Sequence, residues 1–296
     1  MNQWNPHKLK DQSGKELNYV PSFTNLALTF QKNLLKRFEE LQDKVSIIIQ
    51  GPIHQRSINT IPEYLKYGEV VVSCWNNDNL NAIQKYKNKI TLVVNDFKKA
   101  SRLSVNSGAK NPYIFQNYST LEGLKAAKNF LAIKFRSDES YPVIDPILKK
   151  IKENRDTKDK QGNYNNFKLV TSNIYFRFDD EIKFHPSDHF IGGERNRMIK
   201  VFEKSTKLAS IPTKLSPEQV ICKSALETYF DPINKCYDKF DFSKSIELMQ
   251  KHFDIIRINS LPRCIWTSSY RKYDALKGEE RWCHNIKELS RKKLTK

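Results

Sequence analysis

Two adjacent carboxylates, Asp138 and Glu139, directly follow an apolar segment in the stretch AIKFRSDES, residues 132–140. Carboxylates are hard oxygen donors, and Mg²⁺ in proteins often takes one or two of them together with oxygens of a substrate phosphate. The pair therefore indicates a site where a divalent metal meets a diphosphate. An exposed turn held by salt bridges is the alternative, and these residues alone leave both interpretations open.

Two cations precede the carboxylates. Lys134 and Arg136 alternate with Phe135, so both side chains of an extended strand would point to the same side. Cations placed in this way can bind the negative charge of a phosphate.

A second candidate follows the apolar run 45–49. Gln50 offers both a donor and an acceptor, and Gly51 before Pro52 lets the backbone approach a ligand closely. A tight turn without a ligand is the alternative for this tripeptide.

Two acidic residues further along the chain could act as bases. Asp188 lies in the loop HPSDHFIGG, and Glu218 lies at a predicted helix start, where the helix dipole favours an ionised carboxylate. Ordinary helix-start chemistry is the alternative for Glu218. His185, Asp188 and His189 match a zinc site poorly, because such sites need a third or fourth ligand in suitable geometry.

The elements that would position these residues alternate along the chain. Short apolar runs rich in β-branched residues predict buried parallel strands, and helical spacing predicts helices between them. The predicted strands are 44–53, 69–75, 89–96, 130–135 and 168–178, and the predicted helices include 25–42, 58–67, 81–88, 117–129 and 142–155. Ser119 or Thr120 could cap the helix at 117–129. The alternation predicts an α/β fold with a mostly parallel, doubly wound sheet, whose ligands bind beyond the carboxyl ends of the strands.

Composition narrows the function class only in part. The formal charge of +18 indicates attraction to a polyanion, such as nucleic acid, acidic lipid or a phosphorylated small molecule. Five cysteines without a CxxC pair favour a reducing compartment, so we expect a cytoplasmic protein, at most peripheral to a membrane. No GxGxxG, GxxxxGK[ST] or GxSxG motif occurs, which counts against dinucleotide-binding Rossmann enzymes, P-loop NTPases and serine hydrolases.

The order of the motifs resembles the WavE-type lipopolysaccharide synthesis proteins, glycosyltransferases of bacteria and some large viruses. The likeness is carried by SIIIQGPI, VVVSCW, NYSTLEGLKAAKNFLAIKFRSDE, SDHFIGG and SPEQ, over roughly residues 45–222. It implies one glycosyltransferase domain over 1–296 with a GT-A-like α/β fold. Residues 1–44 would form an arm and helix, 45–180 the nucleotide-sugar-binding half, and 181–296 the acceptor-binding half with a basic tail.

The resemblance also implies roles for the candidate residues. RSDE stands where such enzymes carry a DxD motif, so Asp138 would bind Mn²⁺ or Mg²⁺, while Lys134 and Arg136 would face the diphosphate. Arg136 occupies the first acidic position and could itself neutralise part of the diphosphate charge. Gln50, Gly51 and Pro52 would border the base, and Ser119 and Thr120 the donor pocket. Asp188 and Glu218 match acceptor-side acids; one would be the base of an inverting transfer, and a retaining transfer needs none.

We therefore expect transfer of a sugar from a nucleotide-diphosphate donor, a UDP-sugar being favoured, to a hydroxyl of a glycan in lipopolysaccharide or surface glycoprotein synthesis. The positive charge could also contact an anionic membrane or an acidic glycan. We expect no specific nucleic-acid partner. The alternatives are a basic nucleic-acid-binding protein, whose affinity would fall steeply with salt, and a sugar nucleotidyltransferase, which usually shows a Gly-rich phosphate loop near its amino terminus.

Overall fold

The computed structural model describes residues 44–105, 113–156, 168–177, 183–211, 213–229 and 242–265, together with position 28. All of these except position 28 belong to one compact unit, Lys44–Lys296. The predicted arm and helix before residue 44 and the predicted basic tail lie outside the described residues. Within the described part of the chain, no helix is both long enough and apolar enough to cross a membrane.

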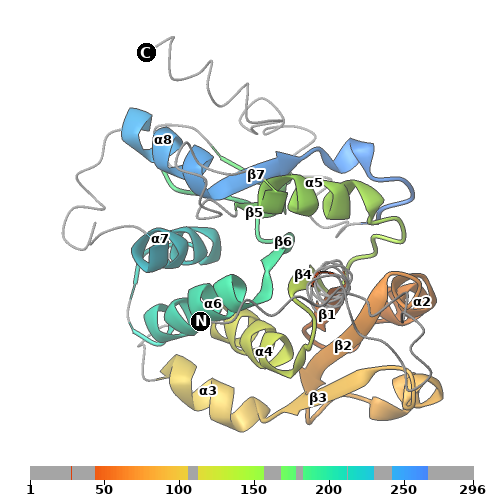
Figure 1. The fold of residues 1–296 in the computed structure, drawn as a ribbon. Helices are drawn as coiled ribbons and strands as arrows, with labels where there is room; N and C mark the ends of the chain where they lie inside the picture. Colours follow the sequence, from red (N-terminus) through yellow and green to blue (C-terminus); the bar gives the residue numbers. More distant parts are fainter. Residues whose placement is uncertain are drawn as a thin grey trace, which may run out of the picture. The chain divides into compact units, whose positions relative to one another are not determined.

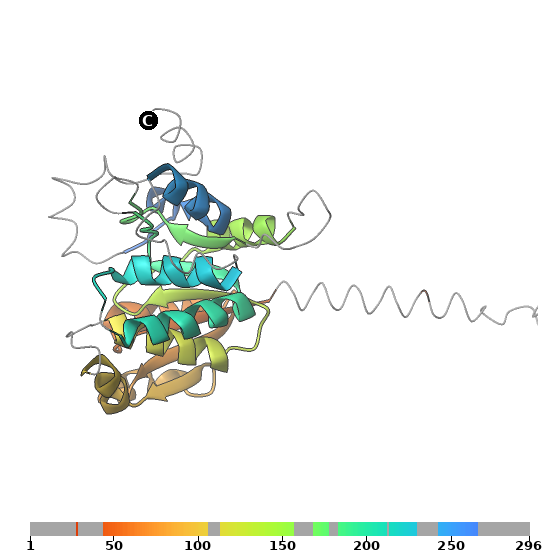
Figure 2. The ribbon, with the colours of Figure 1, turned by 90° about the vertical axis from the view of Figure 1, so that its left-hand side faces the viewer.

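Seven strands form one sheet with helices on both faces (Figures 1 and 2). The strands are β1 (Val45–Gln50), β2 (Gly68–Trp75), β3 (Thr91–Asn95), β4 (Leu131–Arg136), β5 (Leu169–Ser172), β6 (Phe190–Glu194) and β7 (Phe253–Ile256). Their spatial order is β3-β2-β1-β4-β6-β5-β7. Among these described strands, β6 alone runs antiparallel to its neighbours. The predicted α/β class, a mostly parallel sheet flanked by helices, is confirmed.

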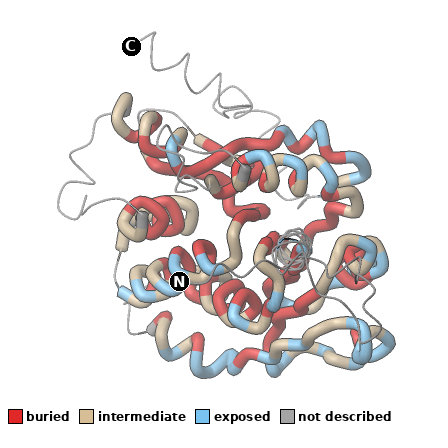
Figure 3. The backbone as a smooth tube through the Cα atoms, viewed as in Figure 1, coloured by how far each residue is buried: buried red, intermediate tan, exposed pale blue. Residues whose placement is uncertain are grey.

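The central strands are apolar on both sides because helices cover both sides of the sheet. Ile47 and Ile49 of β1 pack into one buried cluster, whereas Ile48 packs into the other. In Figure 3 the central strands are correspondingly drawn as buried along most of their length. A continuous β-branched run therefore predicts a central strand of this kind.

Each face of the sheet has its own group of helices. The first buried cluster includes residues of α2 (Gln55–Tyr64), the 3₁₀ helix η2 (Leu80–Tyr86) and α5 (Asp145–Asp156). The second includes residues of α4 (Tyr113–Ala126), α6 (Arg195–Ala209), α7 (Pro217–Tyr229) and α8 (Phe242–His252). The remaining helices of the described residues are α3 (Phe97–Val105) and the 3₁₀ helix η4 (Ile258–Ser260).

Three local predictions are wrong. Ser119 and Thr120 do not cap α4, because the helix begins at Tyr113 and both side chains are buried within it. The predicted strand 168–178 ends at Ser172, and Tyr175 beyond it has a left-handed backbone with φ of 56°. The segment that reads as a turn-rich loop before α6 contains β6, which inserts between β4 and β5.

Gly123 sets how closely α4 packs on the sheet. A Cβ atom at this position would lie 2.6 Å from Ile48 Cγ2 and 3.1 Å from Ser73 Cβ. In an exposed helix, Gly→Ala stabilises by about 0.5–1 kcal/mol. We expect Gly123→Ala to destabilise the protein instead, by about 1–3 kcal/mol, because the helix must shift away from β1 and β2.

Denaturant unfolding of Gly123→Ala and of a control, Lys125→Ala, on an exposed position of the same helix, measures this effect. The control should change stability by less than about 0.5 kcal/mol. Equal or higher stability of Gly123→Ala would show that α4 does not pack on the sheet as closely as described.

Candidate functional site

A cavity of about 460 Å³ lies where β1, β2 and β4 end, at the carboxyl edge of the parallel strands. This is the edge at which open α/β sheets bind ligands. The cavity is lined by Gln50, Gly51, Pro52, His54, Trp75, Tyr113, Phe115, Gln116, Ser119, Arg136, Ser137, Asp138, Asp188, Pro217 and Glu218. Eight of the ten residues predicted from sequence are in this set, and Thr120 and Lys134 are not.

The end of β1 requires glycine. Gly51 has φ of +113°, and a Cβ atom there would lie 2.9 Å from Ser137 Oγ. The backbone of β1 also joins both neighbouring strand ends, because Gly51 N donates to Ser73 O at 3.1 Å and Ser137 N donates to Gln50 O at 2.9 Å. The loop after β1 is thus fixed against the turn after β4.

A buried hydrogen-bond chain holds the amide of Gln50. Asn95 Nδ2 donates to Ser73 Oγ at 2.9 Å, and Ser73 Oγ donates to Ser119 O at 2.6 Å. Ser119 Oγ lies 3.0 Å from Gln50 Oε1. This contact involves the carbonyl end of the Gln50 amide, and Gln50 also lines the cavity.

An aromatic group forms another wall. Trp75, at the end of β2, meets Phe115 of α4 edge to face, with ring centroids 5.4 Å apart. Phe97 stacks on Phe115 at 4.8 Å. Trp75 and Phe115 line the cavity and offer planar apolar surface against which another ring can pack. No local sequence pattern joins Trp75 to the aromatic residues of α4.

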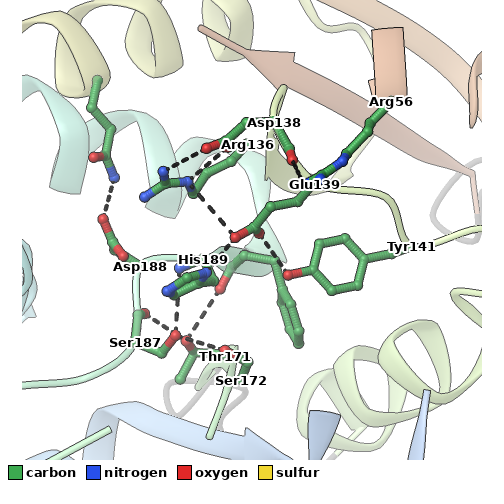
Figure 4. Close-up of polar contacts among 12 residues, drawn as sticks. Arg56, Arg136, Asp138, Glu139, Tyr141, Thr171, Ser172, Ser187, Asp188 and His189 are labelled. Atoms are coloured by element: carbon green, nitrogen blue, oxygen red, sulfur yellow. Dashed lines mark hydrogen bonds and ion pairs between the residues drawn. The ribbon is translucent and has the colours of Figure 1, made fainter. Parts of the chain in front are cut away.

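The turn after β4 is organised by Arg136 (Figure 4). Its Nε donates to Asp138 Oδ1 at 3.0 Å and its Nη2 to Asp138 Oδ2 at 2.9 Å, which makes a bidentate ion pair. Arg56 Nη1, from α2, donates to Asp138 O at 3.1 Å. Two guanidinium groups therefore fix the side chain and the backbone of Asp138.

Glu139 points inward, beneath the cavity. Its Oε1 lies 2.5 Å from His189 Nδ1, and its Oε2 accepts from Tyr141 Oη at 2.6 Å. Burial and the neighbouring Glu139 charge raise the pKa of Tyr141 well above its usual value, so Tyr141 keeps the proton that it donates. Glu139 thus links the β4 turn to the loop before β6. The sequence, in which Glu139 simply follows Asp138, does not predict this structural role.

Asp188 is nearly enclosed at the opposite wall. Gln116 Nε2 donates to Asp188 Oδ2 at 2.6 Å, and Lys134 Nζ donates to Asp188 O at 2.5 Å. Burial would raise the pKa of Asp188, but the charges of Lys134, His189 and Arg136 and the Gln116 hydrogen bond outweigh burial and hold it well below its usual range. Asp188 is therefore a firmly ionised carboxylate.

Lys134 lies below the cavity. It is fully buried, and burial lowers its pKa to about 8 although the Asp188 charge opposes this shift. Thr120 is also buried, and its Oγ1 has no hydrogen-bond partner among the described residues. The structure therefore brings Lys134 next to Asp188 but gives neither Lys134 nor Thr120 a surface on the cavity.

Glu218 is positioned by the start of α7. Ser216 Oγ accepts from Gln219 N at 3.2 Å, and Gln219 Oε1 accepts from Ser216 N at 3.0 Å, which is a capping box. Glu218 Oε2 lies 3.3 Å from His185 Nε2, and His185 Nδ1 lies 2.9 Å from the carbonyl of Tyr175. Since a carbonyl only accepts, Nδ1 carries a proton and Nε2 faces Glu218.

The two histidines of HPSDH therefore have different partners. His185 pairs with Glu218 and His189 with Glu139. Among the described residues, no three or more His, Cys, Asp or Glu side chains are grouped as metal ligands. A metal at the predicted ligand, Asp138, would have to share that carboxylate with Arg136, which pairs with both of its oxygens.

One comparison with known proteins, the scan against protein families, agrees with the resemblance inferred from sequence. The family model for WavE lipopolysaccharide synthesis matches residues 45–227. No curated protein matches the chain.

Two solved glycosyl-transferring enzymes are similar in structure at low identity. Apo-form glycosyltransferase GlyE of Streptococcus pneumoniae TIGR4 is 9% identical with a TM-score of 0.37, over 64% of this chain and 44% of that one. Glucosyl-3-phosphoglycerate synthase of Mycobacterium tuberculosis, solved with Mn²⁺, UDP and phosphoglyceric acid, is 13% identical with a TM-score of 0.32, over 58% of this chain and 69% of that one. The chain thus spans less than half the length of the pneumococcal enzyme.

The buried Lys134 predicts a specific pH dependence. Its pKa is about 8 in the folded protein against a usual value of 10.5, so between these pH values the unfolded chain binds a proton that the folded protein has released. The stability of the wild type relative to Lys134→Met should therefore rise from pH 8 to pH 10.5. At about 1.4 kcal/mol per pKa unit, the rise is about 3 kcal/mol.

Denaturant unfolding at several pH values checks this difference. Lys149→Met, which removes an exposed lysine of α5, is the matched control and should show no such rise. A stability difference between wild type and Lys134→Met that stays constant with pH would contradict the buried position of the ammonium group.

Proposed function

Because the chain belongs to the WavE lipopolysaccharide synthesis family, we propose that it is a glycosyltransferase, which moves a sugar from a nucleotide-diphosphate donor to a hydroxyl of a glycan acceptor. One observation carries the proposal. A single cavity at the strand ends combines an aromatic wall at Trp75 and Phe115, a guanidinium at Arg136, and two carboxylates at Asp188 and Glu218. A nucleotide sugar presents a planar base, a charged diphosphate and a polar sugar, which these three parts complement.

The positions of the walls suggest how the donor lies. The aromatic wall and Gln50 stand at the ends of β2 and β1, so the base would pack there. Uracil offers both acceptors and a donor at its edge, and a side-chain amide can match either. A UDP-sugar is therefore the donor that we propose first.

The diphosphate would then lie at Arg136, with the sugar toward Asp188 and Glu218. In the transfer, a bond forms between the acceptor oxygen and the anomeric carbon, while the bond from that carbon to the diphosphate oxygen breaks. The electron pair of the broken bond stays with the leaving diphosphate. A fixed guanidinium at that position stabilises the charge as it develops.

An inverting transfer also needs a carboxylate that takes the proton of the acceptor hydroxyl. Asp188 is poorly suited, because its pKa lies well below its usual range and an efficient base has a pKa near the working pH. Glu218 lines the same cavity, and its Oε2 lies 3.3 Å from His185 Nε2. We propose Glu218 as the base, and Asp188 as a fixed acceptor of hydrogen bonds from substrate hydroxyl groups.

The family description and the net charge indicate which partners to propose. The family description favours an acceptor in lipopolysaccharide synthesis, and a surface glycoprotein glycan is the other acceptor of the same chemistry. A net charge of +18 would favour an acidic glycan or an anionic membrane surface near the acceptor. We propose a cytoplasmic location and no specific nucleic-acid partner.

Donor binding tests the proposed function first. A thermal-shift panel of UDP-, GDP-, CMP- and TDP-linked sugars, with and without Mn²⁺, should identify one nucleotide that raises the melting temperature, because a ligand of the native state stabilises it by mass action. Phe115→Leu should weaken binding of that nucleotide about fivefold or more, since stacking of a base on an aromatic ring contributes about 1–3 kcal/mol.

Leu92→Ala, an exposed apolar residue on β3, is the control and should bind as the wild type does. No response to any nucleotide would contradict the proposal. Salt-sensitive binding of generic RNA in place of a nucleotide response would favour the nucleic-acid-binding alternative.

The role of Glu218 predicts a separation between binding and chemistry. Glu218→Gln should slow release of the nucleoside diphosphate from the selected donor by about 10²–10⁴-fold, the usual contribution of a general base. Donor affinity should remain unchanged. Glu153→Gln, on α5 outside this cavity, should leave both quantities unchanged. Normal turnover by Glu218→Gln would remove Glu218 from the proposed mechanism.

A further inference from the structure

We infer that the guanidinium of Arg136, and not a divalent metal, supplies the positive charge that binds the donor diphosphate, and that Asp138 positions this guanidinium. The inference rests on the proposed function and gives its site a specific binding chemistry. It excludes the prediction that Asp138 is a metal ligand, so one experiment can decide between them.

Both oxygens of Asp138 are paired with a cation of the protein itself. Both of them accept from Arg136, at 3.0 and 2.9 Å, in a bidentate geometry that matches carboxylate to guanidinium. Arg56 fixes the same residue through its carbonyl oxygen. A metal bound to Asp138 would leave the Arg136 guanidinium beside a second cation, which is electrostatically unfavourable.

The neighbouring carboxylate is not placed to help a metal. The side chain of Glu139 is fully buried, and its two oxygens lie at hydrogen-bonding distance from His189 and Tyr141. Mg²⁺ needs near-octahedral oxygen coordination, usually with one or two carboxylates. In Figure 4, Glu139 points away from Asp138 toward His189 and Tyr141, so the two acids do not converge on one point.

Arg136 retains donors for a phosphate. A guanidinium has five N–H groups, and the pair with Asp138 uses one on Nε and one on Nη2. The side chain is 22% exposed and lines the cavity, so its other N–H groups are within reach of a ligand there. The planar fork of guanidinium N–H groups suits phosphate oxygens as well as it suits the carboxylate.

The protein also holds this guanidinium in place before any ligand arrives. Asp138 fixes it on one side, and Glu139 Oε1 lies 3.8 Å from its Nε. Glu139 is in turn held by His189, which precedes β6. Preorganised charge of this kind binds a diphosphate without the cost of ordering a flexible side chain.

Calorimetric titration with UDP, and with the nucleoside diphosphate that the thermal-shift panel selects, tests the inference. We expect the same dissociation constant in EDTA and in excess Mn²⁺, within about threefold, which is less than 0.7 kcal/mol. Arg136→Met should weaken binding about tenfold to hundredfold in both buffers, because it removes charged hydrogen bonds. Asp138→Asn should bind in EDTA with a smaller loss.

Arg136→Lys keeps the charge but loses the bidentate fork, so its affinity should lie between wild type and Arg136→Met. It also serves if Arg136→Met fails to fold. Lys149→Met is the control for loss of a remote cation.

Binding that requires Mn²⁺ and disappears in EDTA would overturn the inference and leave the proposed function intact. Absence of binding in both buffers would overturn both.

Discussion

A series of ion pairs and hydrogen bonds at the carboxyl end of β4 is the interaction on which the site depends. Asp138 pairs with Arg136, Arg136 approaches Glu139, and Glu139 pairs with His189. The side chains of Glu139 and His189 are buried, so removing either one takes a hydrogen-bond partner from a buried polar group, which is costly. These contacts therefore fix the β4 turn and the loop before β6 relative to one another. The two segments form two walls of the cavity.

The antiparallel β6 makes this connection possible. In the β4–β6 register Phe135 pairs with Phe190, so the residues just before β6 lie at the carboxyl end of β4. Asp188 and His189 thus arrive at the ligand edge from a strand that runs in the opposite direction. A parallel strand in this position would bring its last residues to the edge instead, and the HPSDH loop would lie at the other end of the sheet.

Sequence patterns predict the parts of this structure that follow local rules. Short runs of apolar residues predict β1 to β4, and their ends predict the edge where Gln50, Arg136 and Asp138 gather. Local patterns do not predict β6, because Gly192 and Gly193 have low strand propensity. Gly192 is nevertheless suited to its place, since a Cβ atom there would lie 2.6 Å from Ile151 Cδ1. The formation of β6 depends on packing between segments that are distant in sequence, and a local sequence pattern cannot predict such packing.

Local sequence patterns also do not predict which side chains pair when they are far apart in sequence. Glu139 and His189 are 50 residues apart, and nothing in the HPSDH motif indicates that His185 and His189 pair with two different glutamates. A crystal structure with the bound nucleoside diphosphate tests the central claim most directly. We predict the diphosphate within hydrogen-bonding distance of Arg136, with the base against Trp75 and Phe115. A diphosphate bound outside this cavity, or held at Asp138 through a metal with Arg136 displaced, would contradict the account.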